Sequence, residues 1–211
     1  MAAAALLAFT PPVAKAATYT FDNVAGNGAG FAINGATVDW TANTADKIWN
    51  TDTGSTYGDT TWLNKTTFAA DTLVFNAGTN VGTINLKTAV ANVGGWTDNL
   101  GVTLTAANST STISLLGTTA IFNVATGKNS SIGAIIQGQS SLKKTGLGVL
   151  SLTAANSFTG TFELLNGGAI LGASNPLGTG DFIWHRNTTI ATTSSDSSHT
   201  TVGTLFLDLS G

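Results

Sequence analysis

The amino-acid sequence predicts an all-β protein whose chain winds into a solenoid of stacked parallel strands. Two observations support this prediction: short runs of alternating apolar residues separated by Gly- and Asn-rich turns, and a six-residue segment that occurs twice. The segment LTAANS stands at 104–109 and again at 152–157, an offset of 152 − 104 = 48. This offset equals two coils of about 24 residues, within the range of solenoid repeats. A β-sandwich would also use such short strands but gives no reason for a fixed offset.

The composition is that of a folded β protein with few charges. The 211 residues include 42% hydrophobic and 9% charged residues, and the polar remainder is mainly Thr, Ser and Asn, with 25 Gly. Thr suits strands, whereas Gly and Asn suit tight turns. The net charge is −3 and the basic residues are scattered except for Lys143 and Lys144, so nucleic acid is not an expected partner. The absence of Cys excludes disulfides and suits a secreted bacterial protein.

The amino terminus has the features of an export signal. The apolar run AAAALLAF at 2–9 and the small-residue pattern Ala14-Lys15-Ala16 predict a signal peptide over residues 1–16, possibly truncated because a positively charged lead is missing. The alternative is a merely apolar terminus. No later segment has the roughly 20 apolar residues of a membrane helix, so stable membrane insertion is not expected. We therefore expect an exported protein, at the cell surface or outside the cell.

The chain divides into an unusual amino-terminal region and a more regular remainder. Three of the five Trp, at positions 40, 49 and 62, lie in the first eighty residues, and we expect residues 17–100 to form an aromatic-rich cap and the first rungs. Residues 101–211 are expected to form further rungs, and their alternating runs predict these inward-pointing side chains: Leu104, Leu115, Leu150, Leu152, Phe162 and Leu164. In the two LTAANS segments, Asn108 and Asn156 are expected to occupy the same corner, with positive φ.

Residues 142–180 contain a Lys-Thr-Gly-x-Gly turn, a Leu-x-Leu strand, an Ala-Asn-x-Phe-Thr-Gly turn and a closing Leu-Gly-x-Gly. This order closely resembles the autotransporter-associated β-strand repeat, also called the passenger-associated transport repeat. The positions that carry the resemblance are Leu142, Lys144, Thr145, Gly146, Gly148, Leu150, Leu152, Asn156, Phe158, Thr159, Gly160, Asn166, Gly168, Leu177, Gly178 and Gly180.

The resemblance implies a right-handed parallel β-helix in a large exported or surface-displayed bacterial protein associated with the outer membrane. In such proteins the repeat is associated with export and folding of the passenger. Glu163 departs from a strand usually built from Thr, Val and Gly. Only one full repeat is evident, so we expect the chain to be a segment of a longer protein. The glycines, leucines and phenylalanines of the repeat have structural roles that need no catalysis.

One predicted strand contains side chains that could bind or cleave a polysaccharide. The stretch DFIWHR brings together Asp181, Trp184, His185 and Arg186, the kinds of side chain that polysaccharide-processing β-helices place on an outer groove. Glycoside hydrolysis normally needs two carboxylates, and the only Glu, Glu163, belongs to a different predicted strand. We therefore expect a non-catalytic structural segment. The alternative is a carbohydrate-binding or polysaccharide-cleaving β-helix module, with polysaccharide as the candidate class of surface partner.

No metal or cofactor is expected from the sequence. Asp52 and Asp59 could offer oxygen ligands to calcium, but neither of the usual calcium-loop patterns is present. His185 and His199 lack the further ligands that zinc requires. The exterior distinguishes the two functions: a groove with several acids and exposed aromatic rings would favour the carbohydrate module, and a uniform Thr/Ser/Asn exterior would favour the scaffold.

Overall fold

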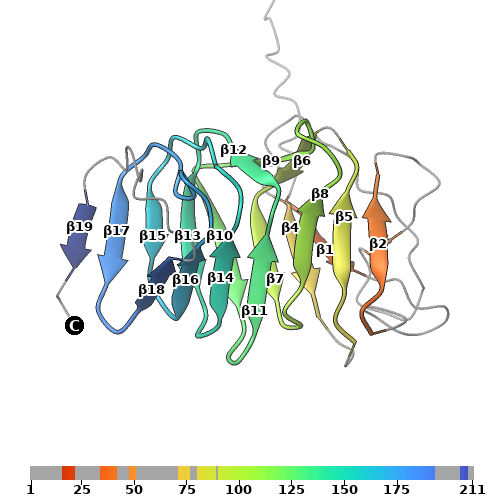
Figure 1. Ribbon diagram of the computed structural model, residues 1–211, viewed down its shortest axis with the longest axis horizontal. Helices are drawn as coiled ribbons and strands as arrows, with labels where there is room; N and C mark the ends of the chain where they lie inside the picture. The colour runs from red at the N-terminus through yellow and green to blue at the C-terminus, as the bar shows by residue number, and fades with distance from the viewer. Residues whose placement is uncertain are drawn as a thin grey trace, which may run out of the picture.

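The computed structural model describes residues 16–21, 34–41, 48–50, 71–76, 80–88, 90–192 and 205–208. Within these ranges the chain forms β-strands and turns and contains no helix. The strands lie side by side across the molecule, from β2 at one end to β19 at the other (Figure 1). The prediction of an all-β chain wound into a parallel β-solenoid is confirmed.

Three sheets make up the walls of the solenoid. Sheet 1 contains β3 (Trp49–Asn50), β1 (Thr18–Phe21), β4 (Thr72–Phe75), β7 (Gly95–Asp98), β10 (Thr119–Val124), β13 (Ser141–Thr145), β15 (Phe162–Leu164), β17 (Phe182–His185) and β19 (Leu205–Asp208). Sheet 2 contains β2 (Thr37–Trp40), β5 (Thr83–Leu86), β8 (Thr103–Ala106), β11 (Asn129–Ile132), β14 (Val149–Leu152), β16 (Gly168–Leu171) and β18 (Thr189–Thr192). Sheet 3 contains only β6 (Val90–Val93), β9 (Thr112–Leu115) and β12 (Ile135–Gln137).

From β4 onward the strands follow a fixed cycle in which the chain visits sheet 1, then sheet 2, then the third side. All neighbours within the sheets are parallel except β3, which pairs antiparallel with β1 at the edge of sheet 1. From β4 onward, partner residues in sheet 1 follow one another at short and similar intervals along the chain, as in Thr72 with Gly95 and Phe162 with Phe182. The first coil is longer, because Thr18 pairs with Thr72.

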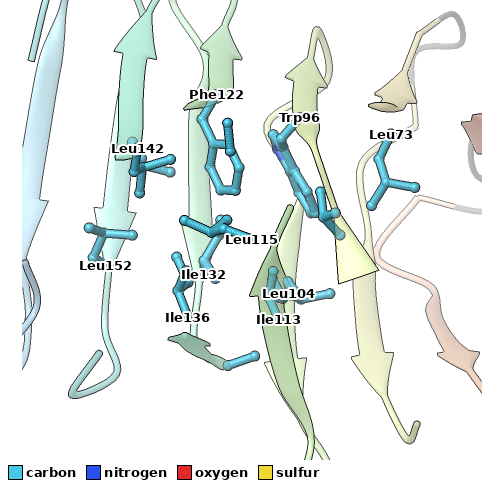
Figure 2. Close-up of a cluster of buried hydrophobic side chains, with 14 of the residues drawn as sticks. Leu73, Trp96, Leu104, Ile113, Leu115, Phe122, Ile132, Ile136, Leu142 and Leu152 are labelled. Atoms are coloured by element: carbon cyan, nitrogen blue, oxygen red, sulfur yellow. The ribbon is translucent and has the colours of Figure 1, made fainter. Parts of the chain in front are cut away.

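The interior is a continuous apolar core. Strand alternation sends every second side chain inward, and the six predicted inward residues, Leu104, Leu115, Leu150, Leu152, Phe162 and Leu164, are all buried. Figure 2 shows side chains from sheets 1, 2 and 3 meeting in this interior. The core is therefore built by stacking coils, since one coil alone could not enclose it.

Aromatic residues are concentrated at the amino-terminal end of this core. Trp49 makes edge contacts with Phe21, Trp40 and Phe75, at ring-centroid distances of 5.7, 5.1 and 5.8 Å. Trp96 continues the series from the next coil and lies 4.5 Å from Phe75. These rings belong to the region expected from the sequence to form the terminal cap and first rungs, and Trp62 lies outside the described residues.

The spacing of the two LTAANS segments has the predicted cause. Leu104 of β8 pairs with Ile132 of β11, and Ile132 pairs with Leu152 of β14. The two leucines of LTAANS therefore stand two coils apart in one inward column of sheet 2. The step from Leu104 to Ile132 is longer than the step from Ile132 to Leu152, because the first of these coils has a longer loop before its strand of sheet 3.

The prediction that Asn108 and Asn156 share a corner with positive φ is wrong. Asn108 is exposed, and its Oδ1 accepts a hydrogen bond of 3.0 Å from the amide of Thr110 within its own loop. Asn156 is buried and lies on the third side of the solenoid, beside Ile136 of β12. Among the described non-Gly residues only Asn187 has a positive φ, of 64°. The segments diverge because a loop separates β8 from β9, whereas the later coil reaches its third side sooner.

Candidate functional site

The repeat residues build one coil and the corners that join it to its neighbours. Leu142, Leu150, Leu152, Phe158 and Leu177 are buried and fill the interior. Thr145 faces outward on β13, and Thr159 is exposed in the segment after β14. Packing inside the solenoid therefore accounts for the apolar positions of the motif.

The corner after β13 requires glycine at two positions. Gly146 has φ of 74°, and a Cβ at this position would meet Val124 O and lie 2.7 Å from Asn123 Oδ1. A Cβ on Gly148 would lie 2.7 Å from Lys128 O. Real Cβ atoms do not approach oxygen this closely, so successive corners stack backbone on backbone. This close stacking brings carbonyl groups of two coils to the interior side of the corner.

Lys144 occupies the centre of this corner and points into the core. It lies in the inward column between Phe122 of β10 and Leu164 of β15, and it is 0% exposed. Its Nζ donates hydrogen bonds to three backbone carbonyls, those of Thr145 at 2.7 Å, Gly146 at 2.9 Å and Asn166 at 3.2 Å. Three acceptors match the three protons of an ammonium group.

Burial lowers the pKa of Lys144 from 10.5 to about 8, because leaving water disfavours the charged form. At neutral pH the side chain still carries its charge. The ammonium group therefore joins its own corner to the corner of the next coil, where Asn166 lies. We call Lys144 and its three carbonyl acceptors the lysine hub.

Asn156 joins three coils on the third side, where sheet 3 has ended. Its Oδ1 accepts a hydrogen bond of 2.8 Å from the amide of Ile136 in β12. Its Nδ2 donates to Pro176 O at 2.5 Å, and Asn175 Nδ2 donates to Asn156 O at 3.1 Å. The side-chain amide thus takes the place of backbone groups in a strand ladder, which explains why a polar residue is buried here.

Charged side chains gather on the outer face of sheet 1. Glu163 Oε2 lies 2.8 Å from Lys143 Nζ, and Glu163 Oε1 lies 2.9 Å from His185 Nε2. The three side chains come from β13, β15 and β17, which are neighbours in the sheet. We call this group the outer charged row. Its side chains are 20% to 31% exposed, so it is a partly buried cross-strand network.

The structure agrees only in part with the expectation that the side chains of the DFIWHR strand gather on an outer groove. His185 faces outward and joins the outer charged row, while Asp181 is exposed just before β17. Trp184 pairs with Leu164 and packs against the core, so it is not an outer platform for a sugar ring. Arg186 is exposed in the turn that follows. The structure therefore brings His185 together with Glu163, and it separates both from the aromatic ring.

The described residues contain no group of three or more His, Asp and Glu side chains that could hold a metal ion. Asp52, Asp59 and His199, the other candidate ligands in the sequence, lie outside the described ranges. In the part of the chain that the structure describes, no helix is long and apolar enough to cross a membrane.

Two of the buried charged residues, Lys144 and Asp98, were not identified as such from the sequence. Lys144 appeared only as a motif position, although alternation from the inward Leu142 would have placed it inside. Asp98 is also 0% exposed, and its carboxylate accepts hydrogen bonds from the amides of Leu100, Gly101 and Val102 at 2.7 to 2.8 Å. An Asp followed three residues later by Gly is a turn signal that could have indicated this role. Comparison of the chain with protein-family models, curated proteins and solved structures finds no match.

Proposed function

We propose that the chain is a non-catalytic structural segment, a β-helical stalk or passenger of a large exported bacterial surface protein. We further propose that residues 142–180 belong to the autotransporter-associated repeat and assist export and folding of the passenger. The observation that carries the proposal is the exterior of sheet 2. Its outward positions align from coil to coil and bear mostly short hydroxyl or amide side chains, among them Thr37, Thr83, Asn85, Thr103, Thr105, Asn129 and Ser131.

The rest of the described surface supports the same function. Its exposed large hydrophobic side chains are Ile121 and Leu147, and neither carries an aromatic ring. Glu163 contacts Lys143 and His185, and the exposed Asp39 is paired with Lys87, whose hydrogen bond is the main cause of the lowered pKa of Asp39. An exterior of mainly uncharged side chains around a filled core suits a rigid spacer that holds the rest of the surface protein away from the cell.

Surface display tests the structural role. The chain is placed between a secretion signal, an amino-terminal epitope and an outer-membrane anchor, and it is compared with a Gly/Ser linker of equal length. We expect the epitope to remain accessible to antibody and the segment to resist protease, with deletion of 142–180 reducing the amount displayed. Equal display and protease resistance of the deletion and the intact chain would contradict the proposal.

The outer charged row favours a second candidate, a polysaccharide-binding module. A carboxylate beside an imidazole on an outer face can hydrogen-bond sugar hydroxyl groups. Binding to a panel of neutral and acidic polysaccharides tests this, with Glu163→Gln as the variant and Asp39→Asn as the matched control on another exposed ion pair. Saturable binding that Glu163→Gln abolishes and Asp39→Asn preserves would replace the structural proposal with this one.

A further inference from the structure

The turn between β15 and β16 contains the dipeptide Asn166-Gly167 at the edge of the lysine hub. We propose that Asn166 is a site of spontaneous deamidation, a covalent modification that this corner permits and the corresponding hydrogen bonds at Asn34 suppress. The inference is independent of the proposed function, because it rests on the chemistry of two residues and on their hydrogen bonds.

The reaction needs only water as a co-reactant. The backbone nitrogen of Gly167 attacks Cγ of the Asn166 side chain, the new N–Cγ bond closes a succinimide ring, and the Cγ–Nδ2 bond breaks. The amide proton of Gly167 leaves with Nδ2 as ammonia. Water then opens the ring at either carbonyl, which gives aspartate or isoaspartate. Glycine favours the attack because it has no side chain to crowd the nitrogen.

The corner leaves both reacting groups accessible. Asn166 is exposed, and its side chain makes no hydrogen bond to any residue that the structure describes. Gly167 accepts a hydrogen bond at its carbonyl from the amide of Thr189 at 3.0 Å, but its own N–H donates none within the described ranges. The nucleophilic nitrogen and the amide carbon can therefore meet without first breaking a native hydrogen bond.

A second Asn-Gly dipeptide provides an internal control. At Asn34-Gly35, the N–H of Gly35 donates to Val81 O at 2.6 Å, and Asn34 Oδ1 accepts from the amide of Val81 at 3.0 Å. Both reacting groups are held by one residue of the next coil. Reaction at Asn34 therefore requires a local opening of the structure, which Asn166 does not require.

Packing requires glycine at position 167, so the fold retains the reactive Asn-Gly dipeptide. Gly167 has φ of 74°, and a Cβ there would meet Gly148 O and lie 2.6 Å from Gly146 O. Any other residue at 167 would disrupt the stacked corners. Conversion of Asn166 to isoaspartate would route the main chain through its side chain and turn the carbonyl that binds Lys144 into a carboxylate. We therefore expect the isoaspartate form to loosen the lysine hub.

Peptide mapping by mass spectrometry tests the proposal on the full chain. Folded protein is held at mildly alkaline pH, and the fraction deamidated is followed at Asn166 and at Asn34. We expect Asn166 to convert faster by on the order of tenfold, which corresponds to a local opening free energy of about 1.4 kcal/mol at Asn34. In denaturant the two rates should become similar, and Asn166→Gln should abolish the signal at its site.

Equal rates in the folded protein, or a faster reaction at Asn34, would overturn the proposal. The effect on the hub is tested by separating the isoaspartate form and comparing its thermal midpoint with that of Asn166→Asp, which carries the carboxylate on a normal backbone. A lower midpoint for the isoaspartate form supports the loosening. Identical midpoints would show that the modification leaves the hub intact and would overturn that part.

Discussion

The corners after β7 and β13 occupy the same position in the solenoid, two coils apart, and each buries one charge of opposite sign. After β7, the Asp98 carboxylate accepts three N–H groups from the loop that follows it. After β13, the Lys144 ammonium donates to three carbonyls. Both side chains are 0% exposed. A buried charge is tolerated in either corner because backbone groups replace the water it loses.

The two corners differ in how far each charge reaches. All partners of Asp98 lie two to four residues further along the same loop, so the carboxylate organises one turn. Lys144 binds two carbonyls of its own corner and a third, on Asn166, that lies 22 residues away in the next coil. The anion therefore fixes local structure, whereas the cation connects coils. Substitutions at Asp98, at Lys144 and at a core position without such hydrogen bonds test this difference.

The largest expected effect comes from an inward carboxylate that has no such partners. Leu152→Asp would place a charge in the core beside Ile132 and Leu171, without the three amides that serve Asp98. We expect a loss of about 5 kcal/mol in the free energy of unfolding, from lost burial and an unpaired charge. Denaturant titration measures it. Thr153→Asp, at an exposed neighbouring position, is the control and should change stability by less than about 0.5 kcal/mol.

Removing the lysine hub should be the next largest change. Lys144→Ala leaves three carbonyls without their donor and a cavity between Phe122 and Leu164, so we expect a loss of about 4 kcal/mol. Lys144→Met refills most of the space and should lose about half as much. Hydrogen exchange should show the increase in local opening in β15 and β16. An increase confined to β13 and its own corner would mean that the hub does not connect coils.

Asp98→Asn should have a smaller and more local effect. The amide keeps one acceptor oxygen but points an NH₂ group at the backbone amides, so we expect a loss of about 3 kcal/mol in the free energy of unfolding. Exchange of the amides of Leu100, Gly101 and Val102 should accelerate. Unchanged exchange at Asn166 and its neighbours is the matched control, because no partner of Asp98 lies there.

The smallest expected effect is the pH dependence caused by Lys144. Its pKa is about 8 when folded and 10.5 in the unfolded chain, so between these values the unfolded state binds more protons. Stability should therefore rise with pH in this window and stay level below it. Relative to Lys144→Met, the wild-type protein should gain about 2 kcal/mol between pH 7 and about pH 9.5. A fall in stability relative to Lys144→Met would show that the three carbonyls outweigh burial.

The sequence predicted the interior better than the corners and the outer face. Period-two alternation placed Leu150 and Leu152 inside, because a strand has only two faces. The shared corner of Asn108 and Asn156 failed because loop length, which alternation does not record, differs between the two coils. The contact of Glu163 with His185 was also missed. It depends on the short coil that sets β15 beside β17, and this register follows from stacking in three dimensions.

The early end of sheet 3 has a mechanical consequence. The coils that contain β6, β9 and β12 are tied to one another by three ladders, whereas later coils have two ladders and the hydrogen bonds around Asn156. Under tension applied along the axis, these coils act as springs in series, and the weakest link yields first. Peeling from the carboxyl-terminal side should therefore begin beyond β12 and slow when it reaches the three-ladder region, so that the coils that contain β6, β9 and β12 form the stiffer part of the rod.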